Sequence, residues 1–103
     1  MNIQVNSNNQ IEGSERLSEF VRSHIENALK NFSDKVTTVE VHLGDENSSK
    51  EGPADKRCMI EARVAKLQPI AVSDNADTLE QAITGAAGKI KRAIEHAIGK
   101  IRQ

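Results

Sequence analysis

The sequence is poor in aromatic residues, with two Phe and neither Trp nor Tyr among its 103 residues. A core built from this composition must be aliphatic, drawing on Ile, Val, Leu and Ala. Proteins that hold single-stranded nucleic acid by stacking its bases do so on aromatic side chains. The composition therefore argues against base stacking as a way of binding nucleic acid.

Cysteine and long apolar runs are also scarce. The single thiol, Cys58, has no intramolecular disulfide partner, and its place in an alternating run predicts a small buried side chain. No N-terminal stretch resembles a signal peptide, and no run is long and apolar enough to span a membrane. We therefore expect a cytoplasmic protein in a reducing compartment, with no membrane partner.

Patterns typical of catalysis or metal binding are missing as well. The three histidines, His24, His42 and His96, fall on different expected elements, with no carboxylate or thiol at ligand spacing. The segment from Gly85 to Gly88 lies inside an expected helix and lacks the pattern of a phosphate-binding loop. The sequence thus predicts no enzyme activity, no metal, no cofactor and no small-molecule substrate.

The residues that are present alternate or repeat in ways that predict a single domain over residues 1–103. Period-two alternation indicates strands, and apolar residues spaced three and four apart indicate helices. We expect strands at 2–5, 36–43, 57–65 and 70–73, helices at 14–32 and about 78–101, and a long mobile loop at about 44–56. Because each strand has one apolar face, both helices should cover the same face of a four-stranded sheet. The predicted fold is an α+β two-layer sandwich in the order β-α-β-β-β-α.

The second expected helix has a cap predicted at residues 73–77 and an apolar stripe along one side. Glycine costs a helix about 1 kcal/mol relative to alanine, so Gly85 and Gly88 indicate a close approach by the neighbouring helix or by a nucleic-acid backbone. The residues expected to be buried are Leu79, Ala82, Ile83, Ala86, Ile90, Ala93, Ile94, Ala97 and Ile101.

Positive charge is concentrated at the end of a chain whose formal net charge is −1. Residues 1–78 hold nine Lys and Arg against thirteen Asp and Glu, whereas residues 79–103 hold five against two. The slightly negative total therefore hides a basic C-terminal helix.

At 100° per residue, four residues of this helix fall within one sector roughly 80° wide. They are Lys89, Arg92, His96 and Lys100, and we call them the basic row. No carboxylate of the helix lies within this sector, and the row suits a polyanion whose phosphates recur along a groove. The helix dipole also favours cations late in a helix without any ligand. Because the dipole does not choose one side of a helix, the sorting of charge by face favours the polyanion.

A set of dispersed positions, taken with the expected order of elements, resembles one protein family. The positions are Asn8, Asn9, Leu17, Glu19, Phe20, Val21, Leu29, Phe32, Val39, Val41, Leu43, Asp77, Ala82, Ile83, Gly85, Lys89, Ile90, Arg92 and Lys100. A chain with these residues resembles the short ribosome hibernation-promoting factors, also called ribosome-associated inhibitors, of the sigma-54 modulation protein family. The resemblance covers nearly the whole length.

This resemblance implies a fold like a double-stranded-RNA-binding domain with an additional first strand. It also implies binding to ribosomal RNA of the small ribosomal subunit, in the channel for messenger and transfer RNA. Occupancy would block translation sterically and store idle ribosomes during stress or stationary phase. Relatives contact the RNA with basic residues of both helices. Lys89, Arg92 and Lys100 match such positions. With His96 of the basic row and further basic residues of the two helices, the candidate RNA-contacting residues are Lys89, Arg92, His96, Lys100, Lys91, Arg22 and Lys30.

Two other interpretations remain open. Relatives commonly carry Lys where this chain has His24 and Asn27, so it could be a divergent member that acts as a protein-interaction module without strong RNA binding. Its surface would be the exposed sheet face, or an edge strand that pairs two copies into a weak homodimer. A third interpretation is a small-molecule-binding domain, which would need an apolar cavity between sheet and helices. The residues expected on the exposed sheet face are Glu40, His42, Met59, Glu61 and Arg63.

Overall fold

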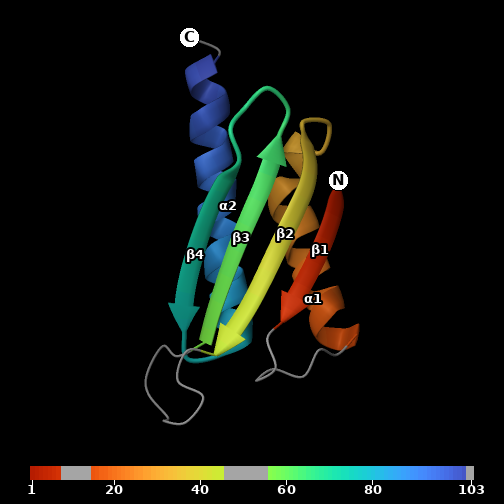
Figure 1. Ribbon diagram of the computed structural model, residues 1–103, viewed down its shortest axis with the longest axis vertical. Coiled ribbons are helices and arrows are strands. Elements are labelled where there is room, and N and C mark those ends of the chain that lie inside the picture. Colours follow the sequence, from red (N-terminus) through yellow and green to blue (C-terminus); the bar gives the residue numbers. More distant parts are fainter. Residues whose placement is uncertain (8–14, 46–55, 102–103) are drawn as a thin grey trace.

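The computed structural model describes residues 1–7, 15–45 and 56–101. The order of its elements confirms the predicted β-α-β-β-β-α arrangement and the α+β class (Figure 1). The elements are β1 (Asn2–Ser7), α1 (Glu15–Leu29), the 3-10 helix η1 (Lys30–Phe32), β2 (Val36–Asp45), β3 (Lys56–Val64), β4 (Ile70–Ala76) and α2 (Leu79–Ile101).

The four strands form one sheet in the order β1-β2-β3-β4, with β1 and β4 at its edges. β1 pairs parallel with β2, a pairing that needs a crossover connection such as α1, and the other two pairings are antiparallel. Both helices cover the same face of the sheet, and both run from the lower to the upper end of the view in Figure 1. The helices are therefore parallel to each other, with α2 packed against β3, β4 and α1.

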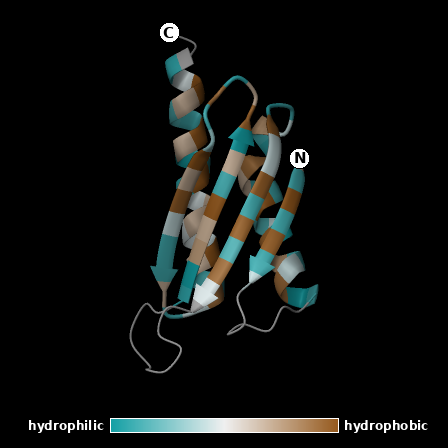
Figure 2. Ribbon diagram, in the orientation of Figure 1, coloured by the Kyte–Doolittle hydropathy of each residue, from teal (hydrophilic) through white to brown (hydrophobic). Residues whose placement is uncertain are grey.

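The predicted alternation of the strands is confirmed. In β3, Cys58, Ile60, Ala62 and Val64 are buried against the helices, as are the alternate apolar residues of β2. Figure 2 shows the resulting hydrophilic and hydrophobic bands along the strands. One buried residue of β2, Val36, precedes a shift in register, where a bulge restores the pairing at Thr38.

The buried stripe of α2 differs in part from the prediction. Ala87 and Ile98 are buried although the prediction left them out, whereas Leu79, Ala93 and Ala97 are only partly buried. The cause is that α2 packs against α1 as well as the sheet, so its buried face is turned toward α1. Its fully buried residues are Ala82, Ile83, Ala86, Ile90 and Ile94, and Ala87 and Ile98 are buried slightly less.

Several element boundaries also differ from the prediction. The strands β2 and β3 include Gly44, Asp45 and Lys56, which the sequence had assigned to the loop, and 46–55 lie outside the described residues. The first helix was predicted to run through Phe32. In the structure α1 ends at Leu29, and the 3-10 helix η1 continues the chain through Phe32.

The predicted cap of α2 at 73–77 is wrong, because β4 continues through Ala76. The pairing of β4 with β3 explains this length, since it extends to the Ala76 and Lys56 pair. The helix is capped by Thr78, whose Oγ1 accepts a hydrogen bond of 3.1 Å from the Gln81 N–H. The cap predicted for the first helix, Ser14, lies outside the described residues.

Candidate nucleic-acid interface

The basic row lies along the side of α2 that faces the edge strand β4. All four of its residues are exposed, because the apolar stripe of the helix is turned toward β3 and α1. The row runs beside β4 in the opposite direction. Lys89 lies next to Ser73 and Asp74 late in the strand, and Lys100 lines a hollow with Ile70 at its start.

One carboxylate reaches this row from outside the helix. The Lys89 Nζ forms an ion pair of 2.9 Å with Asp74 Oδ1 and donates a hydrogen bond of 2.9 Å to the Ser73 carbonyl. The prediction that the row is free of carboxylates was based on the residues of α2 alone. It is correct for the helix and wrong for the folded protein, because β4 extends far enough to bring Asp74 beside Lys89.

Gly85 provides the space for this carboxylate. A Cβ built at Gly85 would overlap Asp74 Oδ2 and lie 2.8 Å from Asp74 Cγ. The close approach predicted from the helix glycines is therefore made by an aspartate of β4, and neither the neighbouring helix nor a nucleic-acid backbone is needed to explain Gly85. At Gly88 the nearest atoms belong to Arg92, whose Nη1 lies 3.3 Å from the position of a Cβ.

Asp74 belongs to the inner face of the sheet. It pairs in register with Cys58, and the two side chains therefore point to the same side as the core. Burial, with a smaller contribution from the negative charge of Asp74, raises the pKa of the Cys58 thiol to about 12. The predicted burial of Cys58 is thus confirmed, and the carboxylate beside Lys89 also lies within electrostatic reach of the core.

The remaining cations of the row have no such partner in the part of the chain that the structure describes. No ion pair there joins a carboxylate to Arg92, His96 or Lys100. The Arg92 side chain folds back over Gly88, in the direction that helical side chains usually take. The row thus has one paired and two unpaired cations, with a histidine between the unpaired ones.

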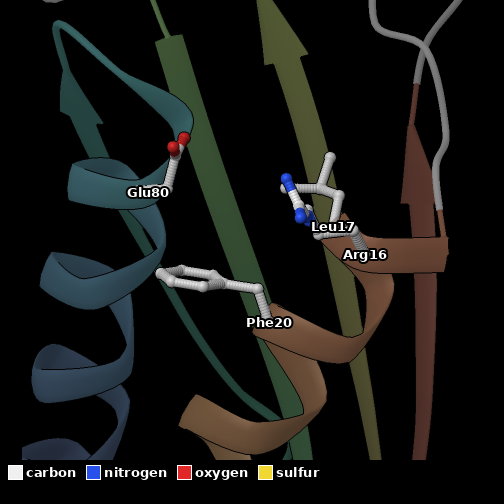
Figure 3. A pocket seen from close by; sticks show the side chains of 4 residues that line it. All are labelled: Arg16, Leu17, Phe20 and Glu80. Carbon is white, nitrogen blue, oxygen red and sulfur yellow. The ribbon is translucent and has the colours of Figure 1, made fainter.

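The other candidate RNA-contacting residues are exposed but do not join the row. Lys91 lies about 200° from Lys89 around α2, on the flank that carries Glu80 and faces α1. The Phe20 ring points from α1 toward α2 (Figure 3), so Arg22, about 200° further around α1, points away from it. Lys30 is exposed in η1. The structure therefore divides the predicted set into separate surfaces.

A groove between the two helices was missed by sequence reasoning. It has a volume of about 240 Å³ and is lined by Arg16, Leu17, Phe20 and Glu80 near the N-terminal ends of α1 and α2 (Figure 3). The Phe20 ring also contacts that of His24, with centroids 4.1 Å apart. The position of Phe20 and Leu17 at the margin of the apolar stripe was the available signal. This groove lies between helices, whereas the small-molecule interpretation needs a cavity between helices and sheet.

The outer face of the sheet carries the residues predicted for a protein-interaction surface. His42 Nε2 lies 3.5 Å from Glu40 Oε2, and Glu40 is paired in register with Glu61 on β3. Neighbouring carboxylates on paired strands repel each other, which favours a cationic partner or solvent at this place. Pairing of edge strands into a weak homodimer stays a prediction.

Two absences among the described residues concern metal ligands and membrane-spanning helices. No three His, Cys, Asp or Glu side chains of residues 1–7, 15–45 and 56–101 come together as a metal site would require. In the same ranges no helix combines the length and hydropathy needed to cross a bilayer.

Solved structures with the same fold include proteins from Thermus thermophilus and Coxiella burnetii. The N-terminal domain of Protein Y from Thermus thermophilus superposes with a TM-score of 0.76 at 16% identity, covering 93% of this chain and 98% of that chain. A ribosomal subunit interface protein from Coxiella burnetii superposes with a TM-score of 0.81 at 11% identity, covering 96% and 99%. Likenesses at such low identity show a shared fold.

Sequence comparison supplies the family. No curated protein matches the chain. The sequence does match the family described as Sigma 54 modulation protein / S30EA ribosomal protein, over residues 3–102. Because the match covers nearly the whole chain, the protein belongs to this family, the same family of ribosome-associated hibernation factors that its residues resemble.

Proposed function

We propose that this protein binds the small ribosomal subunit and inhibits translation by occupying the channel for messenger and transfer RNA. Family membership supports an association with the ribosome. The observation that carries the finer proposal is the basic row, an exposed line of cations beside an edge strand in a chain of net charge −1. Binding of this kind needs no cofactor and no catalytic residues. We propose that the protein acts in the cytoplasm, where it would meet ribosomes.

The mechanism that we propose is steric. From Lys89 to Lys100 the row covers about 16 Å of a helix that rises 1.5 Å per residue. The helix is fixed by a buried aliphatic stripe, so its cations are held on a rigid support. Neutralising phosphates releases counterions, and the affinity should therefore fall steeply as salt rises. The bound domain would then exclude messenger and transfer RNA by its volume.

The printed name of one protein with the same fold supports a site on the ribosome. The Coxiella burnetii protein is described as a ribosomal subunit interface protein. We extend that location to this chain on the strength of its family and its fold. Storage of idle ribosomes during stress or stationary phase is part of the same proposal.

Co-sedimentation with purified small subunits at low and moderate salt tests this function. The double variant Arg92→Glu/Lys100→Glu reverses the two unpaired cations of the row, and it should lose most of the binding. The matched control is Arg63→Glu, which makes the same kind of reversal on β3, outside the row, and should bind like the wild type.

The outcomes separate the two main interpretations. If the double variant still sediments with subunits and Arg63→Glu does not, the sheet face is the binding surface and the row is not. If the wild type fails to sediment at low salt, the proposal of ribosome binding is wrong. In that case a partner captured after nuclease treatment would favour the protein-interaction module.

A further inference from the structure

The ion pair between Asp74 and Lys89 lies at one end of the surface that we assign to RNA. Two of the three donors of the Lys89 ammonium are occupied, one by Asp74 Oδ1 and one by the Ser73 carbonyl, both at 2.9 Å. A phosphate oxygen would have to take the place of the carboxylate or share the ammonium with it. Lys89 therefore differs from Arg92 and Lys100, which meet no carboxylate among the described residues.

The pair is supported from both sides. Asp74 is on the inner face of β4, where its pairing with Cys58 fixes the direction of its side chain. Its side chain is 24% exposed, against 46% for Lys89, so the carboxylate is the more enclosed partner. Opposite it, Gly85 lacks the Cβ that would overlap Asp74 Oδ2. A glycine in the helix and a carboxylate in the strand together form the place that holds the ammonium.

We propose that Asp74 is an internal competitor of RNA phosphate for Lys89, and that it lowers the affinity of the basic row for polyanions. The proposal rests on the RNA-binding function proposed above and names the residue that tunes it. In the free protein the carboxylate neutralises one of the three permanent cations of the row. On binding, a phosphate must displace it, and the gain from Lys89 is reduced by the lost pair.

Replacing Asp74 by Asn removes the competing charge at nearly constant shape. Freeing one cation adds about one phosphate contact, so the dependence of log affinity on log salt should steepen by roughly 0.7 to 0.9. At about 0.1 M salt this corresponds to roughly fivefold tighter binding. The probes are heparin-agarose, eluted with a KCl gradient, and purified small ribosomal subunits titrated at several KCl concentrations.

Two further variants test whether the effect comes from pairing of Asp74 with Lys89, which we call masking of Lys89, or from a general change of net charge. Glu95→Gln makes the same change of net charge at an exposed position of α2 outside the row, and it should shift elution less than Asp74→Asn. Gly85→Ala keeps the charge of the wild type but places a methyl group where Asp74 Oδ2 lies, so it should shift elution in the same direction as Asp74→Asn.

The proposal is overturned if Asp74→Asn elutes with Glu95→Gln, or if it binds more weakly than the wild type. The second result would mean that Asp74 positions Lys89 for RNA. If the variants shift on heparin while no form of the protein binds subunits, masking holds and the proposed function is wrong.

A measurement on the unaltered protein guards against a folding defect in the variants. Reductive methylation at low reagent concentration, read by mass spectrometry, compares the amines of Lys89 and Lys91 on the same helix. Both residues are exposed, but only the Lys89 ammonium is paired with Asp74. Lys89 should react several-fold more slowly, and equal rates would overturn the masking.

Discussion

The two flanks of α2 are built differently, although they belong to one helix. The flank facing β4 carries only cations and a histidine of its own, and the carboxylate beside it comes from another element. The flank facing α1 carries charges of both signs, namely Glu80, Lys91 and Glu95. Glu80 also lines the groove together with Arg16 of α1. The charge of a helix face is therefore decided jointly by the sequence of the helix and by the strand packed beside it.

The buried stripe that separates the flanks should give the largest effect when it is damaged. Ile94 is fully buried, and truncation of such a side chain to Ala costs about 2–5 kcal/mol. We expect Ile94→Ala to lower the free energy of unfolding by that amount in urea denaturation. A loss below about 1 kcal/mol would show that α2 is not held by this stripe and that neither flank is rigidly placed.

Charge reversal on either flank tests the comparison directly. Lys100→Glu reverses a cation of the row and should weaken binding to small subunits by about tenfold or more, since a phosphate contact is replaced by repulsion. Lys91→Glu makes the same change on the mixed flank and should weaken it far less. Equal losses in a salt titration would mean that total charge matters and the face does not.

Alkaline pH tests the core beneath the flank that faces β4, because the buried Cys58 of β3 is paired in register with Asp74. Its folded-state pKa is raised from 9.0 to about 12, so the folded protein favours the protonated thiol. The stability that this contributes is complete below pH 9.0 and is lost as pH rises toward about 12, by up to about 1.4 kcal/mol per pH unit. The urea midpoint of the wild type should fall more steeply between pH 9 and 10.5 than that of Cys58→Ala. Parallel curves would contradict the burial of this thiol.

The start of α2 gives the smallest expected effect and comes with a matched control. Thr78→Ala removes the cap of the helix and should cost about 1 kcal/mol of stability in urea denaturation. Thr84→Ala removes a hydroxyl that donates to the Glu80 carbonyl within the helix, a bond that adds little. If the two variants lose the same stability, Thr78 does not cap the helix.

Local pattern was enough to predict most of the fold. The strands have alternating apolar residues, and this period survives whatever the strands pair with, so the burial of Ile60 and Val41 could be read directly. The same applies to α1, where Val21, Ile25 and Leu29 follow the helical period. Both layers followed because each element had a single apolar face.

The parts that failed depend on contacts between distant elements. Ser73 and Asp74 are typical of a helix cap, but pairing with β3 keeps them in a strand. That extension brings Asp74 to Gly85 and Lys89, which no spacing within α2 could have indicated. The positions of the basic row follow from the helical period alone. That Asp74 pairs with Lys89 could be known only from the register of the sheet.

Because α1 and α2 are parallel, their helix dipoles add to a net dipole along the molecule. In an antiparallel pair the dipoles of two helices largely cancel, but here both partially positive N-termini are at one end and both partially negative C-termini at the other. Lys30 and Lys100 lie at the C-terminal ends, where they offset the negative partial charge. If RNA follows α2, as we propose, it meets helix ends of opposite partial charge, and we expect the complex to have one preferred orientation.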